Sequence, residues 1–461
     1  MDYSNLNISL WNAIIQLGII STAILVSNTL RRKVRFIRDS LMPTAVLGGF
    51  LLLFLRTVGI IELDIDFLET LVYHGIALGF IAMSLRIVAK SAQSGNLAGP
   101  KSGAIIVGSY LIQAIVGLII SIGLAYTVMP DMFKAAGILL PMGYGQGPGQ
   151  ANNVGTTYEA VGFVGGRSFG LALAATGFLC ACIVGVIGLN ILARKGKVKR
   201  FSGVEVSGTA SIESFQDDGE MPVSESVDKF SIQIALVLFV YIATYLVTRL
   251  ITGTLLKLTP GLAATLNPLL WGFNFIIGSA LAILTRVVLK KMRDARVMTR
   301  QYQNNYLLNR ISGVFFDIMI IAGIASINIG SLTGLWLPLV LMSVAGGVVS
   351  WYFLAWVCKK AYKGYYYEGI MSMYGMMTGT ISSGVLLLRE IDPNLETPAA
   401  NNLITGSSFA IIFGAPMLVL IGLAYKSTAM TFVTLGLCVV YLALMLLFIF
   451  KVNSRKSDKK K

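Results

Sequence analysis

The sequence contains a polar, glycine-rich stretch, GYGQGPGQANN at Gly143–Asn153, between two long apolar segments. Glycine and proline weaken a helix, and amide side chains lack hydrogen-bond partners in lipid. Irregular backbone at membrane depth is tolerated only where protein buries it or where it lines a watery cavity. The stretch therefore predicts a broken segment within a membrane protein, with its polar groups facing a site.

A weaker copy of this pattern follows about 230 residues later, at Tyr374–Ser383 with the sequence YGMMTGTISS. In both stretches a Tyr-Gly pair is followed four residues later by another glycine, and then by paired small polar residues. We expect the rest of the chain to bring these two stretches together.

The composition predicts a polytopic membrane protein. The chain of 461 residues is 55% hydrophobic and only 13% charged, with a mean hydropathy of +0.75, whereas a soluble protein carries roughly 25% charged residues. The net charge of +15 does not indicate nucleic-acid binding, because the basic residues are spread between apolar segments and form no basic domain. The four cysteines show no metal-ligand spacing and are interpreted as small apolar packing residues.

The apolar runs predict eleven transmembrane helices, each near the ~20 residues that a span needs: 9–30, 41–60, 67–88, 102–128, 168–193, 230–252, 262–290, 311–329, 333–357, 403–424 and 428–450. Two further segments, 135–160 and 366–391, are too polar or broken to count as spans. Basic residues concentrate on the cytoplasmic side, and Arg31 to Arg38 place the N-terminus outside. If both segments are re-entrant hairpins, all but six of the 37 Lys and Arg residues are cytoplasmic.

The same orientation predicts an inverted-topology repeat. Residues 1–195 form the first repeat, with five spans and the hairpin 135–160. A cytoplasmic linker at 196–229 follows, and residues 230–427 form the second repeat, with five spans and the hairpin 366–391. Residues 428–461 add an extra span and a basic tail, which places the C-terminus in the cytoplasm. Inverted repeats with broken helices that meet near the midplane are typical of secondary transporters.

The chain resembles the bacterial sodium/glutamate symporters. The resemblance is carried by the tip Gly145-Gln-Gly-Pro-Gly-Gln-Ala-Asn152 and the glycine-rich span from Ser168 to Gly185, with Pro43 before Gly48-Gly49 and the stretch 374–383. It implies two domains, ten spans, two re-entrant loops, an elevator-like movement, a homodimer in the bacterial inner membrane and sodium-driven uptake of glutamate. The family has a Gly-Gly-His-Gly type tip in each hairpin, whereas Gln146 and Tyr374 stand in the comparable places here. The substrate therefore stays open to another carboxylate or amino acid.

Residues from both hairpin tips are the candidates for binding the substrate, because amides and hydroxyls both donate and accept hydrogen bonds. They are Gly145, Gln146, Gly147, Gly149, Asn152, Asn153, Thr378, Gly379, Thr380, Ser382 and Ser383. A second set lies within or at the ends of spans and supplies oxygen ligands that suit a sodium ion. This set consists of Asp317, Asn274, Asn401 and Asn402.

The sequence thus predicts a cation-coupled transporter of glutamate or a similar carboxylate, with Na⁺ as the coupling ion, membrane lipid as its surroundings and no organic cofactor. An enzyme is not expected. An aspartyl intramembrane hydrolase needs a Gly-x-Gly-Asp motif, which the sequence lacks, and Ile381-Ser382-Ser383-Gly384 lacks the first glycine of a serine-type motif. A passive channel stays an alternative, distinguished by uptake that neither saturates nor depends on an ion gradient.

Overall fold

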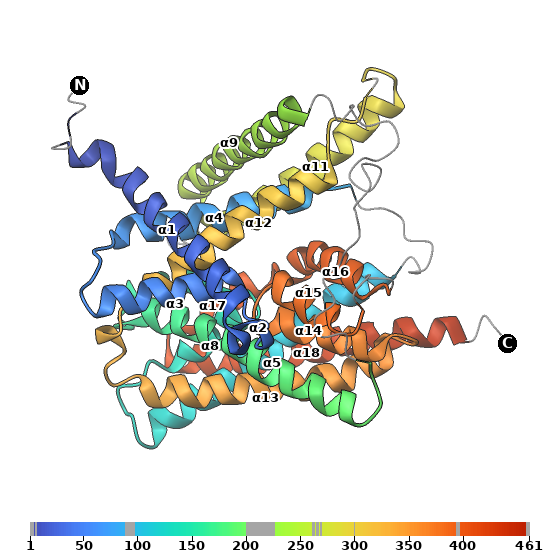
Figure 1. The fold of residues 1–461 in the computed structure, drawn as a ribbon. Helices are drawn as coiled ribbons and strands as arrows, with labels where there is room; N and C mark the ends of the chain where they lie inside the picture. Colours follow the sequence, from blue (N-terminus) through green and yellow to red (C-terminus); the bar gives the residue numbers. More distant parts are fainter. Residues whose placement is uncertain are drawn as a thin grey trace. The chain divides into compact units, whose positions relative to one another are not determined.

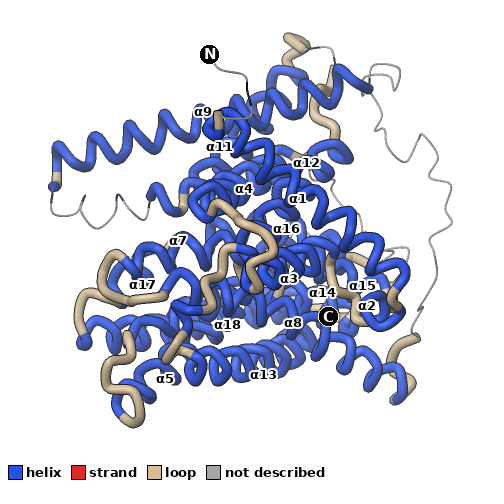
Figure 2. The backbone as a smooth tube through the Cα atoms, turned by 60° about the vertical axis from the view of Figure 1, so that its left-hand side comes forward, coloured by secondary structure: helices blue, strands red, loops and turns tan. Residues whose placement is uncertain are grey.

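The computed structural model describes residues 4, 7–87, 97–199, 226–260, 263, 267, 270–298, 300–392 and 397–457. Most of the predicted linker 196–229 and the end of the basic tail, Lys459–Lys461, lie outside these residues. Figure 2 shows helices joined by loops, without a strand in the described chain. The prediction of an all-α protein is confirmed for this part of the sequence.

The chain divides into two compact units that interleave along the sequence. Unit 1 consists of Met1–Val72, Gln93–Gly203 and Ile318–Lys461, and unit 2 consists of Tyr73–Ala92 and Val204–Asp317. The helices α4 (Ile65–Leu85) and α12 (Asn305–Ala325) contribute to both units. Both polar, glycine-rich stretches lie in unit 1, although they belong to different halves of the sequence.

Unit 1 contains most of the helices (Figure 1). Besides its parts of α4 and α12, they are α1 (Ile8–Lys33), α2 (Arg35–Asp39), α3 (Thr44–Thr57), α5 (Ala98–Tyr126), η1 (Lys134–Ile138), α6 (Leu139–Tyr144), α7 (Pro148–Glu159), α8 (Gly166–Arg194), η4 (Gly330–Leu332), α13 (Trp336–Ala361), α14 (Tyr366–Thr378), α15 (Ile381–Arg389), α16 (Ala399–Gly414), α17 (Met417–Ala424) and α18 (Thr428–Ser457).

Helix α5 lies in the core of unit 1. In its most apolar stretch 72% of the residues are buried, whereas in the corresponding stretches of α1 and α18 only 22% are buried. A helix that is apolar all round but little buried by protein is suited to face lipid. Small residues let α5 approach α16 closely: a Cβ on Gly103 would lie 2.6 Å from Phe409, and one on Gly406 would lie 2.8 Å from Ser102. Close approach at small residues is characteristic of helix interfaces in membranes.

The end of α12 is fixed by Arg56 at the end of α3. The Arg56 guanidinium donates hydrogen bonds to the backbone carbonyls of Ala325, at 2.5 Å, and Ile327, at 2.8 Å. The last carbonyls of a helix lack intrahelical donors, and a cation there also opposes the negative end of the helix dipole. Arg56 therefore caps the end of α12.

Unit 2 contains α9 (Ser226–Leu258), α11 (Asn274–Asp294), the later part of α4 and most of α12. Figure 1 shows α9 and α11 side by side. Apolar side chains from all four helices form its core: Leu78, Ile81, Ala82, Leu85, Val237, Val240, Ala282, Leu308 and Ile311. Burial of such side chains contributes about 1.5–3 kcal/mol each for the larger ones, so this unit has a core of its own.

The described chain contains fewer clear spans than the eleven predicted. Eight helices are long and apolar enough to cross a membrane, and α16 with α17 forms a ninth span if this pair, bent by 52°, is counted as one. The predicted span 41–60 contains only α3, whose 14 residues rise about 21 Å, less than the ~30 Å hydrocarbon core. The predicted span 262–290 contains α11, which begins at Asn274 and carries Arg286, Lys290 and Lys291 in its second half. The eight to nine long apolar helices are consistent with a multi-pass membrane protein.

Candidate functional site

The first glycine-rich stretch forms a helix, a break and a second helix. Helix α6 ends at Tyr144, and α7 begins at Pro148. Gly147 has φ 84° and ψ −175°, a backbone conformation that residues other than glycine rarely adopt. Pro148 fits the first position of α7 because it has no backbone N–H to satisfy there. The break is therefore encoded locally by the Gly-Pro pair.

The chain doubles back across this break. The ring of Phe133, just before η1, lies 5.4 Å from the ring of Tyr158 near the end of α7, and 5.0 Å from the ring of Phe163. The segment therefore returns near the place where it began. Its helices are η1, α6 and α7, and they extend from Lys134 to Glu159.

The second stretch reverses direction more tightly. Helix α14 ends at Thr378, and α15 begins at Ile381, with only Gly379 and Thr380 between them. A Cβ on Gly375 would lie 2.7 Å from the Ser383 carbonyl oxygen, and one on Gly384 would lie 2.4 Å from the Ser372 carbonyl oxygen. These contacts show α15 packed antiparallel along α14, which a side chain on either glycine would prevent.

The two breaks lie next to each other. A Cβ built on Gly147 would be 3.9 Å from both the Gly379 carbonyl oxygen and the Thr380 Cγ2 atom. Helix α8 lies along both segments, because a Cβ on Gly177 would be 2.5 Å from the Thr378 carbonyl oxygen and 3.1 Å from the Tyr144 ring. The prediction that the two stretches come together is confirmed.

The matching tyrosines of the two stretches attach to the same helix. The Tyr144 hydroxyl donates to the Ser343 carbonyl at 2.6 Å, and the Tyr374 hydroxyl donates to the Gly347 carbonyl at 3.4 Å. Both carbonyls belong to α13 and lie one helical turn apart. Each Tyr-Gly pair thus fixes the helix that precedes its break against α13, which places the two breaks side by side.

Gln113 on α5 joins this arrangement, although the sequence pattern did not single it out. Its side chain is fully buried, and its Nε2 atom donates to the Met377 carbonyl at 2.9 Å and to Ser350 Oγ at 2.8 Å. Its Oε1 atom has no hydrogen-bond partner, and a Cβ on Gly145 would lie 3.1 Å from that oxygen. A polar side chain within an apolar span is the signal that identifies such a residue in a sequence.

Several further buried polar atoms near the breaks lack partners in the structure. They are both amide atoms of Gln150, Oδ1 of Asn152, Oγ1 of Thr380 and Oγ of Ser383. Buried polar groups in proteins are nearly always hydrogen-bonded, so each unpaired group points to a bound water, ion or ligand. Ser383 Oγ also lies over the second break, since a Cβ on Gly379 would be 2.8 Å from it.

The helix ends at the breaks add backbone groups to this set. No side chain caps the N-terminus of α7 or that of α15. The first amides of a helix have no intrahelical acceptor, and they carry the positive end of the helix dipole. The last carbonyls of α6 and α14 carry the opposite partial charge, and those of Pro141, Gly143 and Met377 already accept hydrogen bonds. Thus one small region offers donors for an anion and acceptors for a cation.

The structure assigns the other predicted tip residues different positions. Gly145 packs on the Tyr110 ring, and Gln146 is half-buried. Gly149 and Asn153 are buried in α7. The Thr378 hydroxyl donates to the Tyr374 carbonyl at 2.8 Å and so serves its own helix. The Ser382 side chain lies outside the described atoms.

The four predicted sodium ligands are divided between the two units. Asn402 in unit 1 donates to the Tyr365 hydroxyl at 2.9 Å, its Oδ1 atom is unpaired, and the neighbouring Asn401 is half-buried. Asn274 in unit 2 donates to the Tyr73 hydroxyl at 2.9 Å. Asp317, also in unit 2, has an exposed side chain. Among the residues that the structure describes, no three His, Cys, Asp or Glu side chains gather as a metal site would require.

Arg167 at the start of α8 forms an ion pair with Glu69 on α4. The Arg167 side chain is 11% exposed and that of Glu69 is 33% exposed. The Arg167 backbone amide also donates to Glu159 at the end of α7, at 3.2 Å. Arg167 therefore links α4, α7 and α8, and its charge is neutralised within unit 1.

No protein-family model, curated protein or solved structure matches the chain.

Proposed function

We propose that this protein is a secondary active transporter, with the two broken segments as re-entrant hairpins of an inverted-topology repeat. The observation that supports this most directly is the contact between Gly147 and the Gly379–Thr380 break, surrounded by buried polar atoms without partners. Non-helical backbone in a membrane protein is tolerated where it lines a cavity. Discontinuous helices that meet in this way form the substrate and ion sites of transporters.

The charge pattern at the breaks fits an amino acid substrate. The uncapped N-termini of α7 and α15 favour carboxylate groups. The unpaired oxygens of Gln113, Asn152, Thr380 and Ser383 suit an ammonium group or a sodium ion. We assign sodium-coupled uptake of glutamate to this site, in agreement with the family that the sequence resembles. A cation-coupled transporter of another carboxylate or amino acid is the alternative, because Gln146 and Tyr374 depart from the tips of that family.

Coupling to a cation follows from the energetics of moving an anion. Carrying a net charge of −1 inwards against an inside-negative potential costs about 2.3 kcal/mol per 100 mV. One co-transported Na⁺ cancels this charge, and a tenfold sodium gradient contributes roughly 1.4 kcal/mol. Net inward movement of positive charge with glutamate therefore requires more than one cation. Asp317, Asn274, Asn401 and Asn402 stay our candidates for sodium ligands or their neighbours.

The remaining features of the proposal concern movement and assembly. Both breaks lie in unit 1, so an elevator-like movement can carry the two breaks together as one body. We expect a homodimer in the bacterial inner membrane, with the N-terminus outside and the C-terminus in the cytoplasm. The basic residues at the ends of the apolar helices favour this orientation.

The deciding experiment is uptake by purified, full-length protein in liposomes, with labelled glutamate and gradients of Na⁺, Li⁺ or H⁺. We expect saturable uptake that requires Na⁺, and glutamate binding that strengthens with Na⁺, because linkage between two ligands is reciprocal. Counterflow with other labelled carboxylates and amino acids distinguishes the alternative substrates. Uptake that neither saturates nor responds to an ion gradient would instead indicate a channel.

A matched pair of variants on α7 tests the site itself. Asn152→Ala removes a buried polar group near the break and should abolish uptake without lowering the amount of protein in the membrane. Thr157→Ala, on the same helix, removes a hydroxyl that donates only to the Asn153 carbonyl at 2.9 Å, and it should leave uptake nearly unchanged. Normal uptake by Asn152→Ala would show that α7 does not form part of the substrate site.

A further inference from the structure

Unit 2 contains a cavity that the proposed transport site does not use. Its volume is about 300 Å³, and it lies where the second half of α11 meets the returning residues 298 and 300–303 and Ile87 at the end of α4. This volume lies at the lower limit of the ~300–1,000 Å³ typical of small-molecule sites. The cavity is large enough for one small headgroup.

Backbone and amide contacts hold the walls of this cavity in place. Helix α11 ends at Asp294, and the chain turns at Arg296, which has φ 58°. On the returning segment, Gln301 accepts a hydrogen bond from Arg293, and buried Gln303 donates to the Leu85 carbonyl at 2.9 Å. The segment is therefore attached both to α11 and to α4, and the cavity is preformed.

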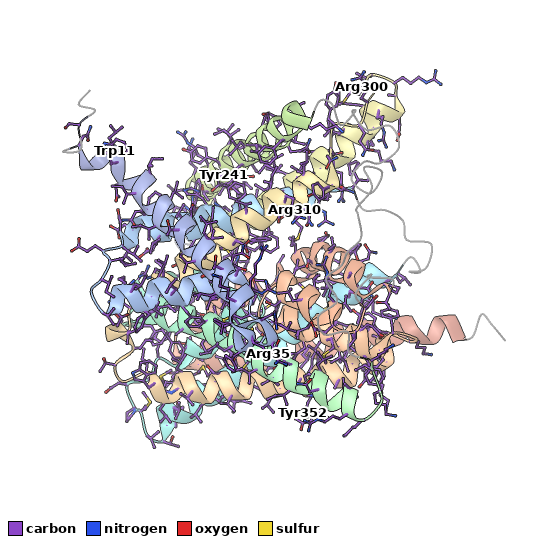
Figure 3. All side chains as sticks on the ribbon, viewed as in Figure 1. Trp11, Arg35, Tyr241, Arg300, Arg310 and Tyr352 are labelled. Carbon is purple, nitrogen blue, oxygen red and sulfur yellow. The ribbon has the colours of Figure 1, made fainter. Side chains whose placement is uncertain are left out.

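Four cationic side chains line the cavity: Arg286, Lys290, Arg293 and Arg300. Its lining, as far as the structure describes it, contains no Asp or Glu. Arg286 is oriented by hydrogen bonds to the carbonyls of Ser84, at 3.3 Å, and Arg86, at 2.8 Å. Figure 3 shows Arg300 in the loop beyond the end of α11. Like charges around one small space repel each other, and a bound anion would relieve that repulsion.

The remaining walls define the kind of anion. Ile87, Val287, Leu289 and Met298 add apolar surface to the cavity, and Gln301 and Gln303 add amides. Arginine binds phosphate oxygens in a bidentate manner, and basic pockets between membrane helices on the cytoplasmic side bind anionic lipid headgroups. The combination suits a phosphate group attached to an apolar or glycerol-like portion.

We propose that this cavity binds a phosphate-bearing anion, either the headgroup of an anionic phospholipid or a soluble phosphate. The proposal is independent of which substrate is transported. If these cations serve only to orient the chain in the membrane, removing cations that line the cavity and removing nearby cations outside it should have the same effect on anion binding. That difference gives the test.

The test uses full-length protein and two double variants that remove the same charge. Lys290→Gln with Arg300→Gln changes two lining residues, whereas Lys291→Gln with Arg296→Gln changes two exposed cations of the same region that do not line the cavity. Binding is measured in nanodiscs by titrating phosphatidylglycerol into phosphatidylcholine, and in detergent with inorganic phosphate and pyrophosphate. Helical content and elution as a single species verify that each variant is folded.

We expect saturable binding that the lining variant weakens about tenfold or more and the control variant weakens less than twofold. Restoring the charge with Lys290→Arg in place of Lys290→Gln should recover part of the affinity. Saturation by phosphatidylglycerol alone identifies a lipid site, and saturation by phosphate or pyrophosphate identifies a soluble ligand. Equal weakening by both double variants, or no saturable binding of any probe, overturns the proposal.

Discussion

The substitution Gly147→Ala tests whether the proposed transport site depends on the conformation of the first break. Gly147 has φ 84° and ψ −175°, which is essentially restricted to glycine. The added methyl group has room, because its nearest neighbours would be the Gly379 carbonyl oxygen and Thr380 Cγ2 at 3.9 Å, an ordinary van der Waals distance. The expected cost is therefore one of backbone conformation and not of steric overlap.

This backbone cost is on the order of 1–3 kcal/mol. Since about 1.4 kcal/mol corresponds to a factor of ten, the native break would be populated roughly five- to 150-fold less, relative to alternatives, than in the parent protein. This factor is the upper bound on the loss of substrate affinity if only the native break binds, because the apparent affinity scales with the competent fraction.

Gly162→Ala is the matched control. Gly162 also has positive φ, at 101°, but it lies in the loop between α7 and α8 and no atom lies within 4 Å of its added Cβ. Both variants should lower thermal stability, but only Gly147→Ala should weaken glutamate binding, measured by scintillation proximity in detergent. Equal losses of binding in both variants, or parental binding by Gly147→Ala, would refute the reasoning.

Three further substitutions follow from contacts in unit 1. Arg56→Met removes two charge-assisted hydrogen bonds to the end of α12, and it should lower the free energy of unfolding by about 1.5–3 kcal/mol in a denaturant titration; a loss below 0.5 kcal/mol would exclude the cap. Arg167→Gln should destabilise the protein by about 1–2 kcal/mol after allowance for solvent screening, and adding Glu69→Gln should recover part of that loss. Additive losses would show that the pair is not coupled. Gln113→Leu should weaken sodium or glutamate binding at least tenfold while the protein stays folded, and unchanged affinities would show that its unpaired oxygen does not face the ligand.

The sequence predicted the elements at the site but not all of its members. The break at Gly147-Pro148 followed from local chemistry, because glycine and proline act on their own backbone. Gln113 was missed although an amide within an apolar span is a signal, because the sequence of α5 does not show where that side chain points. The Thr378 hydroxyl donates to the Tyr374 carbonyl one turn earlier, a bond within its own helix that the sequence pattern did not indicate.

The count of spans shows a second limit of the sequence. Apolar length predicted eleven spans, whereas the described residues contain eight to nine long apolar helices, and α3 begins only after Pro43. Hydropathy averages over such starts, because it measures the transfer of side chains and not the direction of the backbone. The bend between α16 and α17 at Pro416 was likewise absorbed into one predicted span.

Amino-acid order alone determined that this protein is helical, rich in membrane-spanning segments and interrupted at two glycine-rich positions, since these properties depend on neighbours along the chain. Tertiary packing decided that the interruptions touch, that α13 receives both tyrosines, and that α5 supplies an unpaired amide oxygen beside them. These contacts join helices at glycine positions that are more than 200 residues apart in the sequence. Close packing between distant segments is a property of the folded whole, because each contact forms only after other helices have fixed both partners.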